Sequence, residues 1–343
     1  MRCLCCAGML FAGLNAHAQA TDSIADNMVL FQRSSGGWAK QFGISLWPVD
    51  YTKKITPEHK RVLEADEKHY EATIDNDATI PEIRYLVKAY GDTKNKNYLQ
   101  AAEKGIRYLL EAQYDNGGWP QFYPLKKGYY SNITYNDDAM IHVMSLLKDV
   151  ATHAKGFDVV SGSLAAQAQR AVQKGIDCIL KTQVRVNGQL TVWCAQHDEH
   201  TLLPVPARAF ELVSLSGLES VPLVSFLMKI KNPSPEIKQS INSAVEWFKK
   251  SAIKGYDFVI IKDEKQYARG TDGILVPKAG SVLWARFYNM ETNKPFFTGK
   301  DGIARDSVSQ IENERRVGYV WYGRWPEKLI DEEYPKWLKE NGN

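Results

Sequence analysis

Apolar residues recur at every third or fourth position along much of this chain, which is the spacing of amphipathic α-helices. The first clear stripe lies between Thr79 and Tyr90 and comprises Ile80, Ile83, Leu86, Val87 and Tyr90. Thr79 and Glu82 have the spacing of a capping box at the start of this helix, and Gly91 marks its end. A second stripe follows from Leu99, at Ala102, Ile106, Leu109 and Leu110. Together the two stripes predict a helical hairpin.

The same pair of stripes returns twice further along the chain. One pair has apolar residues at Met140, Val143, Met144 and Leu147, and then at Leu164, Ala168, Val172, Ile176 and Ile179. The next pair begins near a second capping-box spacing, Ser216 to Glu219, with apolar residues at Leu218, Val221, 223–227, Ile237, Ile241, Val245 and Phe248. A shorter and atypical first member is expected before Trp38. The chain is therefore predicted to be dominated by α-helical hairpins.

A second repeated feature is a Leu-x-x-Gln-like element followed by a Gly-rich turn and a tryptophan. It reads VLFQRSSGGW from Val29, LLEAQYDNGGW from Leu109 and CILKTQVRVNGQLTVW from Cys178. A charged residue follows each element, at Asp75, Asp137 and Arg208, and these are 62 and 71 residues apart. Hairpins that repeat in this way stack side by side, and a closed α/α toroid would gather the starts of the inner helices around one mouth. An open solenoid is the competing arrangement, but the loops rich in Trp, Tyr, Asp and Gly all fall at one end of the hairpins, which favours the toroid.

Composition permits one large folded domain. The chain has 343 residues, of which 44% are hydrophobic and 24% charged, and no linker or low-complexity tract divides it, so we expect a single domain over residues 21–343. The net charge of +3 comes without a basic cluster, so nucleic acid is not an expected partner. We expect the protein to be a monomer.

The first twenty residues have the pattern of a secretory signal peptide. Arg2 precedes an apolar stretch from Leu4 to Leu14, and Ala16-His17-Ala18 supplies a cleavage site. We therefore expect residues 1–20 to be a signal peptide, the mature protein to be secreted or periplasmic, and no membrane association to remain after its removal. Three of the five cysteines leave with this segment: Cys3, Cys5 and Cys6. Cys178 and Cys194 remain, and they could pair only if the fold brings them together.

The loops at the predicted mouth carry candidate chemistry. Asp75 and Asn76 lie in TIDNDATIPEIRYL, and Asp137 and Asp138 lie in ITYNDDAM, all next to helix starts. Aspartates at such places often only cap helices. That interpretation is weakened because the placement recurs, and because Arg208 occupies the third site although a cation is unfavourable at a helix N-terminus. Several carboxylates around one mouth would suit calcium, which prefers oxygen ligands.

Two further sets of residues have competing interpretations. The aromatic residues either pack the hairpins together or line a groove that stacks on sugar rings: Trp38, Trp119, Phe122, Tyr123, Tyr129, Tyr130, Trp193 and Trp321. His197 and His200 suggest zinc, but they lack the helical spacing of a zinc motif and no matching cluster occurs elsewhere. Zinc is therefore not expected.

At this level of detail the chain resembles the pectate lyases of polysaccharide lyase family 10. The resemblance rests on six stretches between about Met28 and Leu329, in order: TIDNDATIPEIRYL, NGGWPQFYPL, ITYNDDAM, WCAQHDEHTLLPVPARAFELVSLSG, SVLWARFYNMETNKPFFTGKDG and ERRVGYVWYGRWPEKL. It implies an (α/α)3 barrel and calcium-dependent cleavage of polygalacturonate by β-elimination. The Ca2+ ligands implied are Asp137 and Asp75, and the base implied is Arg208.

The resemblance also implies residues that hold the substrate. Arg286 of WARFYN and Lys300 of TGKDG correspond to the family's substrate-gripping cations, and Asp75, Asn76 and Asp138 are further candidate substrate contacts. Lys300 stands where the family usually has arginine, so a bidentate contact with a carboxylate becomes a single ammonium contact.

Two other functions stay open on the residues alone. An inverting glycoside hydrolase could use two of Asp75, Asp137 and Asp198 as acid and base, without arginine or metal. A secreted, non-catalytic protein could instead hold polysaccharide in an aromatic groove. The first would release reducing ends without an unsaturated product, and the second would bind without making any product.

Overall fold

A computed structural model describes residues 20–42, 47–48, 50–66, 70–266 and 270–342 of the chain. Residues 1–19 of the predicted signal peptide, and with them Cys3, Cys5 and Cys6, lie outside the described residues. Cys178 and Cys194 are buried and both are free thiols. No helix in the described part of the chain is long and apolar enough to cross a membrane.

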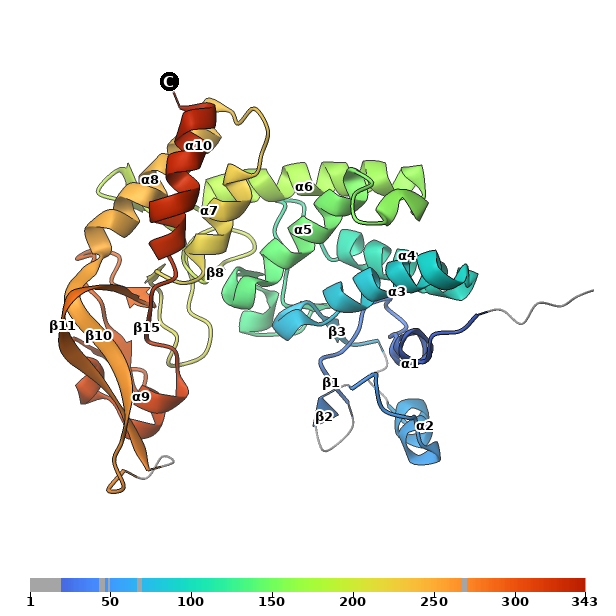
Figure 1. The fold of residues 1–343 in the computed structure, drawn as a ribbon, viewed down its shortest axis with the longest axis horizontal. Coiled ribbons are helices and arrows are strands. Elements are labelled where there is room, and N and C mark those ends of the chain that lie inside the picture. The colour runs from blue at the N-terminus through green and yellow to red at the C-terminus, as the bar shows by residue number, and fades with distance from the viewer. Residues whose placement is uncertain (1–19, 43–46, 49, 67–69, 267–269, 343) are drawn as a thin grey trace, which may run out of the picture.

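Three helical hairpins form the body of the molecule (Figure 1). Their helices are, in chain order, α3 (Ile80–Thr93) with α4 (Lys96–Glu111), α5 (Ala139–Ala151) with α6 (Gly162–Thr182), and α7 (Ser220–Met228) with α8 (Pro235–Ser251). The inner helices α3, α5 and α7 pack against one another in order, and so do the outer helices α4, α6 and α8. Their apolar stripes share one core. The predicted (α/α)3 toroid is confirmed.

The repeated glutamine of the Leu-x-x-Gln elements joins each hairpin to the next. Each amide Nε2 donates to a carbonyl of its own turn and to a carbonyl of the following outer helix. The bonds are Gln32 to Gly36 (2.7 Å) and Ala101 (2.8 Å), Gln113 to Gly117 (3.0 Å) and Ala171 (2.9 Å), and Gln183 to Thr191 (2.8 Å) and Ser240 (3.0 Å). The sequence repeat is therefore a repeated cross-link between neighbouring units.

The repeated tryptophans are packing residues. Trp38, Trp119 and Trp193 are fully buried, and each indole N–H donates to a carbonyl of the preceding helix. The acceptors are Met28 (2.8 Å), Leu109 (2.7 Å) and Ile179 (2.7 Å). Trp321 is likewise buried in a smaller apolar cluster. For these four residues the packing interpretation holds, because a buried indole cannot stack on a ligand.

The first repeat is a single helix, α1 (Ser23–Phe31), packed on α3 and α4, which agrees with the shorter and atypical first member expected there. The capping box expected at Thr79 is wrong. Thr79 precedes α3 but does not cap it: its hydroxyl accepts from Trp38 N–H (2.9 Å) and donates to Thr73 O (2.8 Å). Glu82 accepts instead from the Tyr51 hydroxyl at 2.9 Å. Tertiary partners have displaced the capping box.

Short two-stranded ladders precede each inner helix. β3 (Ala72–Thr73) pairs with β4 (Phe122–Tyr123), β5 (Ile133–Thr134) with β8 (Gln196–His197), and β9 (Leu215–Ser216) with β12 (Phe287–Tyr288). Each ladder ties the strand before an inner helix to a segment that comes after the following outer helix. The ladders therefore fix the turns from which the inner helices start.

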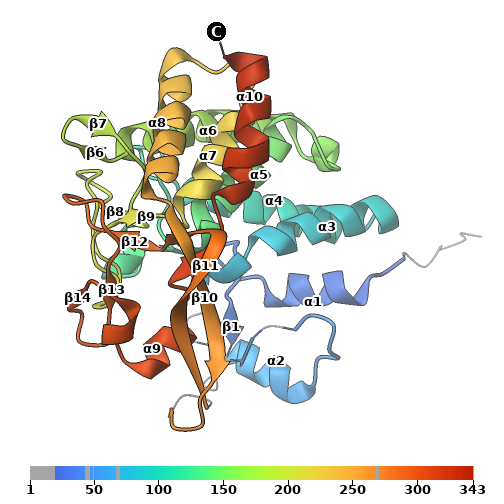
Figure 2. The ribbon, with the colours of Figure 1, turned by 60° about the vertical axis from the view of Figure 1, so that its left-hand side comes forward.

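The C-terminal third adds a long antiparallel hairpin that the helical pattern does not predict. β10 (Ile253–Lys262) pairs with β11 (Thr271–Ala285), with a change of register between Lys254 and Tyr256, and β15 (Tyr322–Gly323) pairs with the end of β11. Figure 2 shows this hairpin projecting from the helical body. The remaining helices are α2 (Pro57–Glu64), α9 (Asn313–Gly318) and α10 (Tyr334–Asn341), and the remaining strands are β1 (Gln41–Phe42), β2 (Trp47–Pro48), β6 (Arg185–Val186), β7 (Gln189–Leu190), β13 (Phe297–Thr298) and β14 (Ala304–Arg305).

Candidate active site

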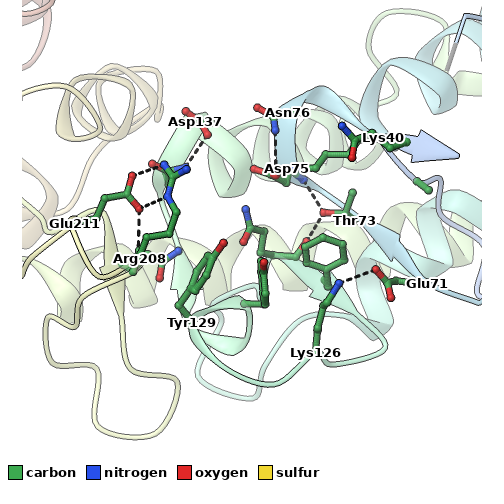
Figure 3. A pocket seen from close by; sticks show the side chains of 18 of the residues that line it. Lys40, Glu71, Thr73, Asp75, Asn76, Lys126, Tyr129, Asp137, Arg208 and Glu211 are labelled. Carbon is green, nitrogen blue, oxygen red and sulfur yellow. Dashed lines mark hydrogen bonds and ion pairs between the residues drawn. The ribbon is translucent and has the colours of Figure 1, made fainter. Parts of the chain in front are cut away.

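One cavity of about 710 Å³ lies where the turns before α3 and α5 meet the loop before β9. Its wall includes Asp75, Asn76, Asp137 and Arg208 (Figure 3). Phe122, Tyr129 and Tyr130 also line it, so these aromatic residues, unlike the tryptophans, face a space that could hold a ligand. The structure brings together the three charged positions that follow the sequence repeat.

Asp75 opens a single 3-10 turn, Asp75–Asp77, two residues after β3. Its backbone N–H donates to the Thr73 hydroxyl at 3.0 Å, and its buried carboxylate forms an ion pair with Lys40. Asn76 donates from Nδ2 to Asp75 Oδ2 at 3.0 Å and has a φ of 47°, in the left-handed region that Asn tolerates better than most residues. The turn thus holds the carboxylate against the cavity wall.

Asp137 occupies the corresponding turn before α5, Asn136–Asp138, with a φ of 51°. Asn136 donates from Nδ2 to Asp137 Oδ2 at 2.6 Å. Burial raises the pKa of Asp137, and Arg286 opposes that shift. Asp138 lies outside the cavity wall, and burial likewise raises its pKa. Of the two adjacent aspartates, only Asp137 is placed to contact a ligand in this cavity.

Arg208 reaches the cavity from the loop before β9, not from the start of α7. The residues that stand three positions beyond the ends of the three ladder strands, Thr73, Thr134 and Ser216, are Asn76, Asp137 and Glu219. Asp75 is therefore one position short of the place that Asp137 occupies, and Arg208 lies outside the repeat. The prediction that the arginine occupies an equivalent repeat position is therefore wrong, although the prediction that it meets the two aspartates at one mouth holds.

The guanidinium of Arg208 is held edge-on by Glu211. Nε donates to Glu211 Oε2 at 2.8 Å and Nη2 donates to Oε1 (Figure 3). Hydrogen bonding and charge attraction from Glu211 raise the pKa of Arg208. The dominant neighbour is a carboxylate three residues along the chain.

Arg286 and Lys300 do not belong to the cavity wall. Arg286 is buried behind the Asp137 turn, where Nη2 donates to Asn136 Oδ1 at 3.1 Å and forms an ion pair with Glu219. Burial disfavours its charge, but the carboxylates of Glu219 and Asp137 outweigh this and raise the pKa of Arg286. Lys300 is exposed, and its Nζ lies 2.5 Å from Glu314 Oε2. In this structure both predicted substrate-gripping cations form ion pairs with carboxylates of the protein.

Most of the cations and carboxylates that line the cavity are not predicted from the sequence. Four ion pairs, which we call the wall pairs, stand along it: Arg33–Asp66, Lys40–Asp75, Lys126–Glu71 and Arg208–Glu211. Asp137 is the one lining carboxylate, among the described residues, that has no ion-pair partner. Only the Arg208–Glu211 pair, three residues apart, has a local signal in the sequence; the others join separate loops.

The oxygen donors of this cavity are of the type that calcium accepts, but they do not form a complete site. Calcium takes six to eight oxygen ligands. Within the described part of the chain, no three His, Cys, Asp or Glu side chains lie close enough together to hold a metal. Asp137 and its neighbours Asn136 and Asp75 could supply part of a ligand set, and the rest would have to come from water and from the carboxylates of a ligand.

The zinc interpretation finds no support. His197 is fully buried, its Nδ1 lies 3.0 Å from Leu202 O, and burial lowers its pKa to about 4. His200 is exposed in the next turn. His197 is a core histidine that donates to the backbone.

Comparisons with known proteins agree with this architecture. The family model of pectic acid lyase matches residues 32–330. Two structures of the family 10 polysaccharide lyase from Cellvibrio cellulosa are similar to the chain, both at 35% sequence identity. One is an aspartate-to-alanine variant in complex with trigalacturonic acid (TM-score 0.78, covering 94% of this chain and 93% of that chain), and the other has a TM-score of 0.77 and covers 93% and 92%. A comparison with curated proteins found no match. The chain belongs to the pectic acid lyase family and is a family 10 polysaccharide lyase.

Proposed function

We propose that this pectate lyase cleaves α-1,4-polygalacturonate by calcium-assisted β-elimination, with Arg208 as the base, and that it releases 4,5-unsaturated oligogalacturonates. The observation that carries the proposal is the meeting of Asp75, Asp137 and Arg208 on one cavity. The relative from Cellvibrio cellulosa that was solved with trigalacturonic acid supports a uronate substrate.

The chemistry requires two things at one place. The proton on C5 of a galacturonate lies next to a carboxylate, and its removal places negative charge on that carboxylate. A bound Ca2+ would supply the Lewis acid that neutralises this charge. A base must then stand on the C5 side of the sugar, close enough to accept the proton.

The residues of the cavity offer both a place for the cation and a candidate base. Asp137 is available for a cation because no residue that the structure describes forms an ion pair with its carboxylate. Asp75 could join once Lys40 turns to a uronate of the substrate, since that lysine is a wall cation. Arg208 lines the same space, and its Nη1 has no hydrogen-bond partner among the described residues.

A spectrophotometric assay on polygalacturonate tests the proposal. We expect absorbance from the unsaturated uronate, its loss with a chelator and its return with added calcium. Arg208→Ala should abolish the signal, whereas Arg107→Ala, which removes an exposed arginine of α4 paired with Glu103, should leave it unchanged. Reducing ends without the chromophore and without sensitivity to chelator would indicate a hydrolase instead. Binding without any product would indicate a non-catalytic protein.

We also propose that the protein is exported and acts as a monomer. The signal-peptide pattern of residues 1–20 supports export. N-terminal sequencing of the protein recovered from the periplasm or the medium should start at Gln19 or at Thr21, and light scattering should give the mass of one chain. An N-terminus at Met1 would contradict the first expectation, and a dimer mass the second.

A further inference from the structure

The ion pair between Arg208 and Glu211 uses one particular edge of the guanidinium. Glu211 accepts from Nε at 2.8 Å and from Nη2, and it also accepts from the backbone N–H of Arg208 at 3.3 Å. Nη1 has no partner among the described residues, and Arg208 is exposed at the cavity. One carboxylate therefore engages Nε and Nη2 and leaves Nη1 open.

Glu211 is itself held firmly. It is 9% exposed, its N–H donates to Arg208 O at 2.8 Å, and its Oε1 accepts from the Tyr319 hydroxyl at 2.9 Å. The Tyr319 ring packs against two guanidinium groups, those of Arg315 at 4.3 Å and Arg286 at 4.7 Å from its centroid. The carboxylate that orients Arg208 is thus fixed by a half-buried, stacked tyrosine on a separate segment of the chain.

We propose that Glu211 is a positioning residue for Arg208, and that it makes Nη1 the nitrogen that accepts the C5 proton. This inference rests on the proposed function. A neutral guanidine has one nitrogen with a lone pair in place of a hydrogen. If that nitrogen were Nε, its lone pair would face a carboxylate oxygen and a hydrogen bond would become a repulsion. Nη2 has a second hydrogen that Glu211 does not accept, but after losing it Nη2 would be an imine N–H, which is a weaker donor to Glu211 than the amine N–H it replaces. Glu211 therefore favours the tautomer with the lone pair on Nη1, as the aspartate of a catalytic triad selects the tautomer of its histidine.

The proton and electrons balance in this arrangement. Nη1 first gives its proton to solvent, and then takes the proton from C5. The C5–H electron pair becomes part of the C4=C5 double bond, and the C4–O pair leaves on the glycosidic oxygen, which takes a proton from water. Nε–H and Nη2–H stay on Arg208 and stay bonded to Glu211 throughout.

The carboxylate that orients Arg208 also lowers the fraction of Arg208 that is neutral and able to accept a proton. Glu211 raises the pKa of Arg208, so fewer molecules hold the neutral form at a given pH. The other groups that face this pair are Tyr129, Tyr319, Arg315, the carboxylate of Asp137 and the ring of Phe210, over which the Arg208 guanidinium lies at 5.1 Å. Arg315 is the only further cation in this set, and its charge partly opposes the effect of Glu211.

Glu211→Gln separates orientation from charge. The variant keeps the size of the side chain and removes its charge, so the acid limb of the kcat/KM profile should move to lower pH, by ~1–3 units if a typical close-pair effect is lost. The amide presents N–H groups to one of the two guanidine donors, so kcat on the plateau should fall ~10–100-fold through misalignment. Glu211→Asp keeps the charge but shortens the side chain. The acid limb of its kcat/KM profile should therefore stay near the wild-type position, while kcat falls.

Two more variants keep the inference falsifiable. Tyr319→Phe removes only the hydroxyl that holds Glu211 and keeps the stacked ring; a smaller fall in kcat is expected. Asp272→Asn is the matched control, because Arg316 binds Asp272 through the same edge, Nε at 2.7 Å and Nη2 at 2.9 Å, away from the cavity. It should lower thermal stability and leave kcat and the pH profile unchanged.

The outcomes distinguish this inference from the proposed function. If the wild type releases no unsaturated product, the proposed function itself fails. If the wild type is active and Glu211→Gln melts at a lower temperature with an unmoved acid limb and an unchanged kcat, Glu211 is merely structural and the inference is overturned.

Discussion

The buried pair of Arg286 and Glu219 lies behind the Asp137 turn, and breaking it should destabilise the protein more than most single substitutions. Arg286 is 7% exposed and Glu219 is 1% exposed. In Arg286→Met the Glu219 carboxylate would keep only the Ser216 hydroxyl and the cost of burying its charge would remain. Removing one partner of a buried pair costs about 3–5 kcal/mol.

That loss is a large share of the 5–15 kcal/mol by which folded domains are typically stable. The double variant Arg286→Met with Glu219→Gln should recover most of it, because the remaining amide carries no charge and can still accept from Ser216. Arg286 also donates to Asn136, which in turn donates to Asp137, so the single variant should lower activity as well.

Urea unfolding followed by tryptophan fluorescence and circular dichroism measures both variants. A loss of less than about 1 kcal/mol for Arg286→Met would place it with ordinary surface substitutions and refute the reasoning. A double variant no more stable than the single one would show that the stranded carboxylate is not the cause. Unchanged stability with a raised KM would instead return Arg286 to the role of a direct substrate contact.

Two other predictions follow from the backbone and from Asp137. Gly117 has a φ of 95°, and a Cβ there would lie 2.0 Å from Lys174 O, so Gly117→Ala should prevent correct folding. Gly128 is the control, because it has a similar φ of 91° but no described atom lies near the position of its Cβ. Gly128→Ala should lower the free energy of unfolding in urea by only ~1–2 kcal/mol. Burial raises the pKa of Asp137 in the folded state above its value in the unfolded chain. Ionised Asp137 therefore lowers the free energy of unfolding at neutral pH, and this loss disappears as pH falls through the raised pKa to below the unfolded value. Asp137→Asn should therefore be at least as stable as wild type at neutral pH and lose that advantage in acid. The variant should also show no calcium-dependent turnover. A melting temperature lower than that of the wild type by more than ~2 °C at neutral pH would contradict the stability prediction.

The helical body could be predicted because the spacing of the apolar residues and the repeat of the hairpins both reflect burial against neighbouring helices. The residues at which the helices end could not be predicted. Gly91 was expected to end α3, but the helix continues to Thr93 and Lys94 takes the left-handed position after it, with a φ of 58°. The β10–β11 hairpin was missed because apolar runs as short as those in β10 fit strand and helix equally well.

Some residues of the site could be predicted from the sequence and others could not. Asp75, Asp137 and Arg208 could be found because each follows a recognisable repeat element or motif. Lys40, Lys126 and Glu71 could not, since their pairing depends on loops that meet only in the folded chain. The burial of Arg286 is also a tertiary property.

The wall pairs have a consequence for how ligand binding responds to salt. Unpaired lysines and arginines on a surface attract small anions, and a polyanion that replaces them binds much more weakly as salt rises. In the wall pairs other than Arg208–Glu211 the cations already hold aspartate and glutamate side chains, so an arriving uronate displaces a carboxylate of the protein and not a chloride ion. Its affinity should therefore depend only weakly on ionic strength. The displaced carboxylates stay in the cavity as newly available oxygen ligands, which makes uronate and cation binding mutually reinforcing.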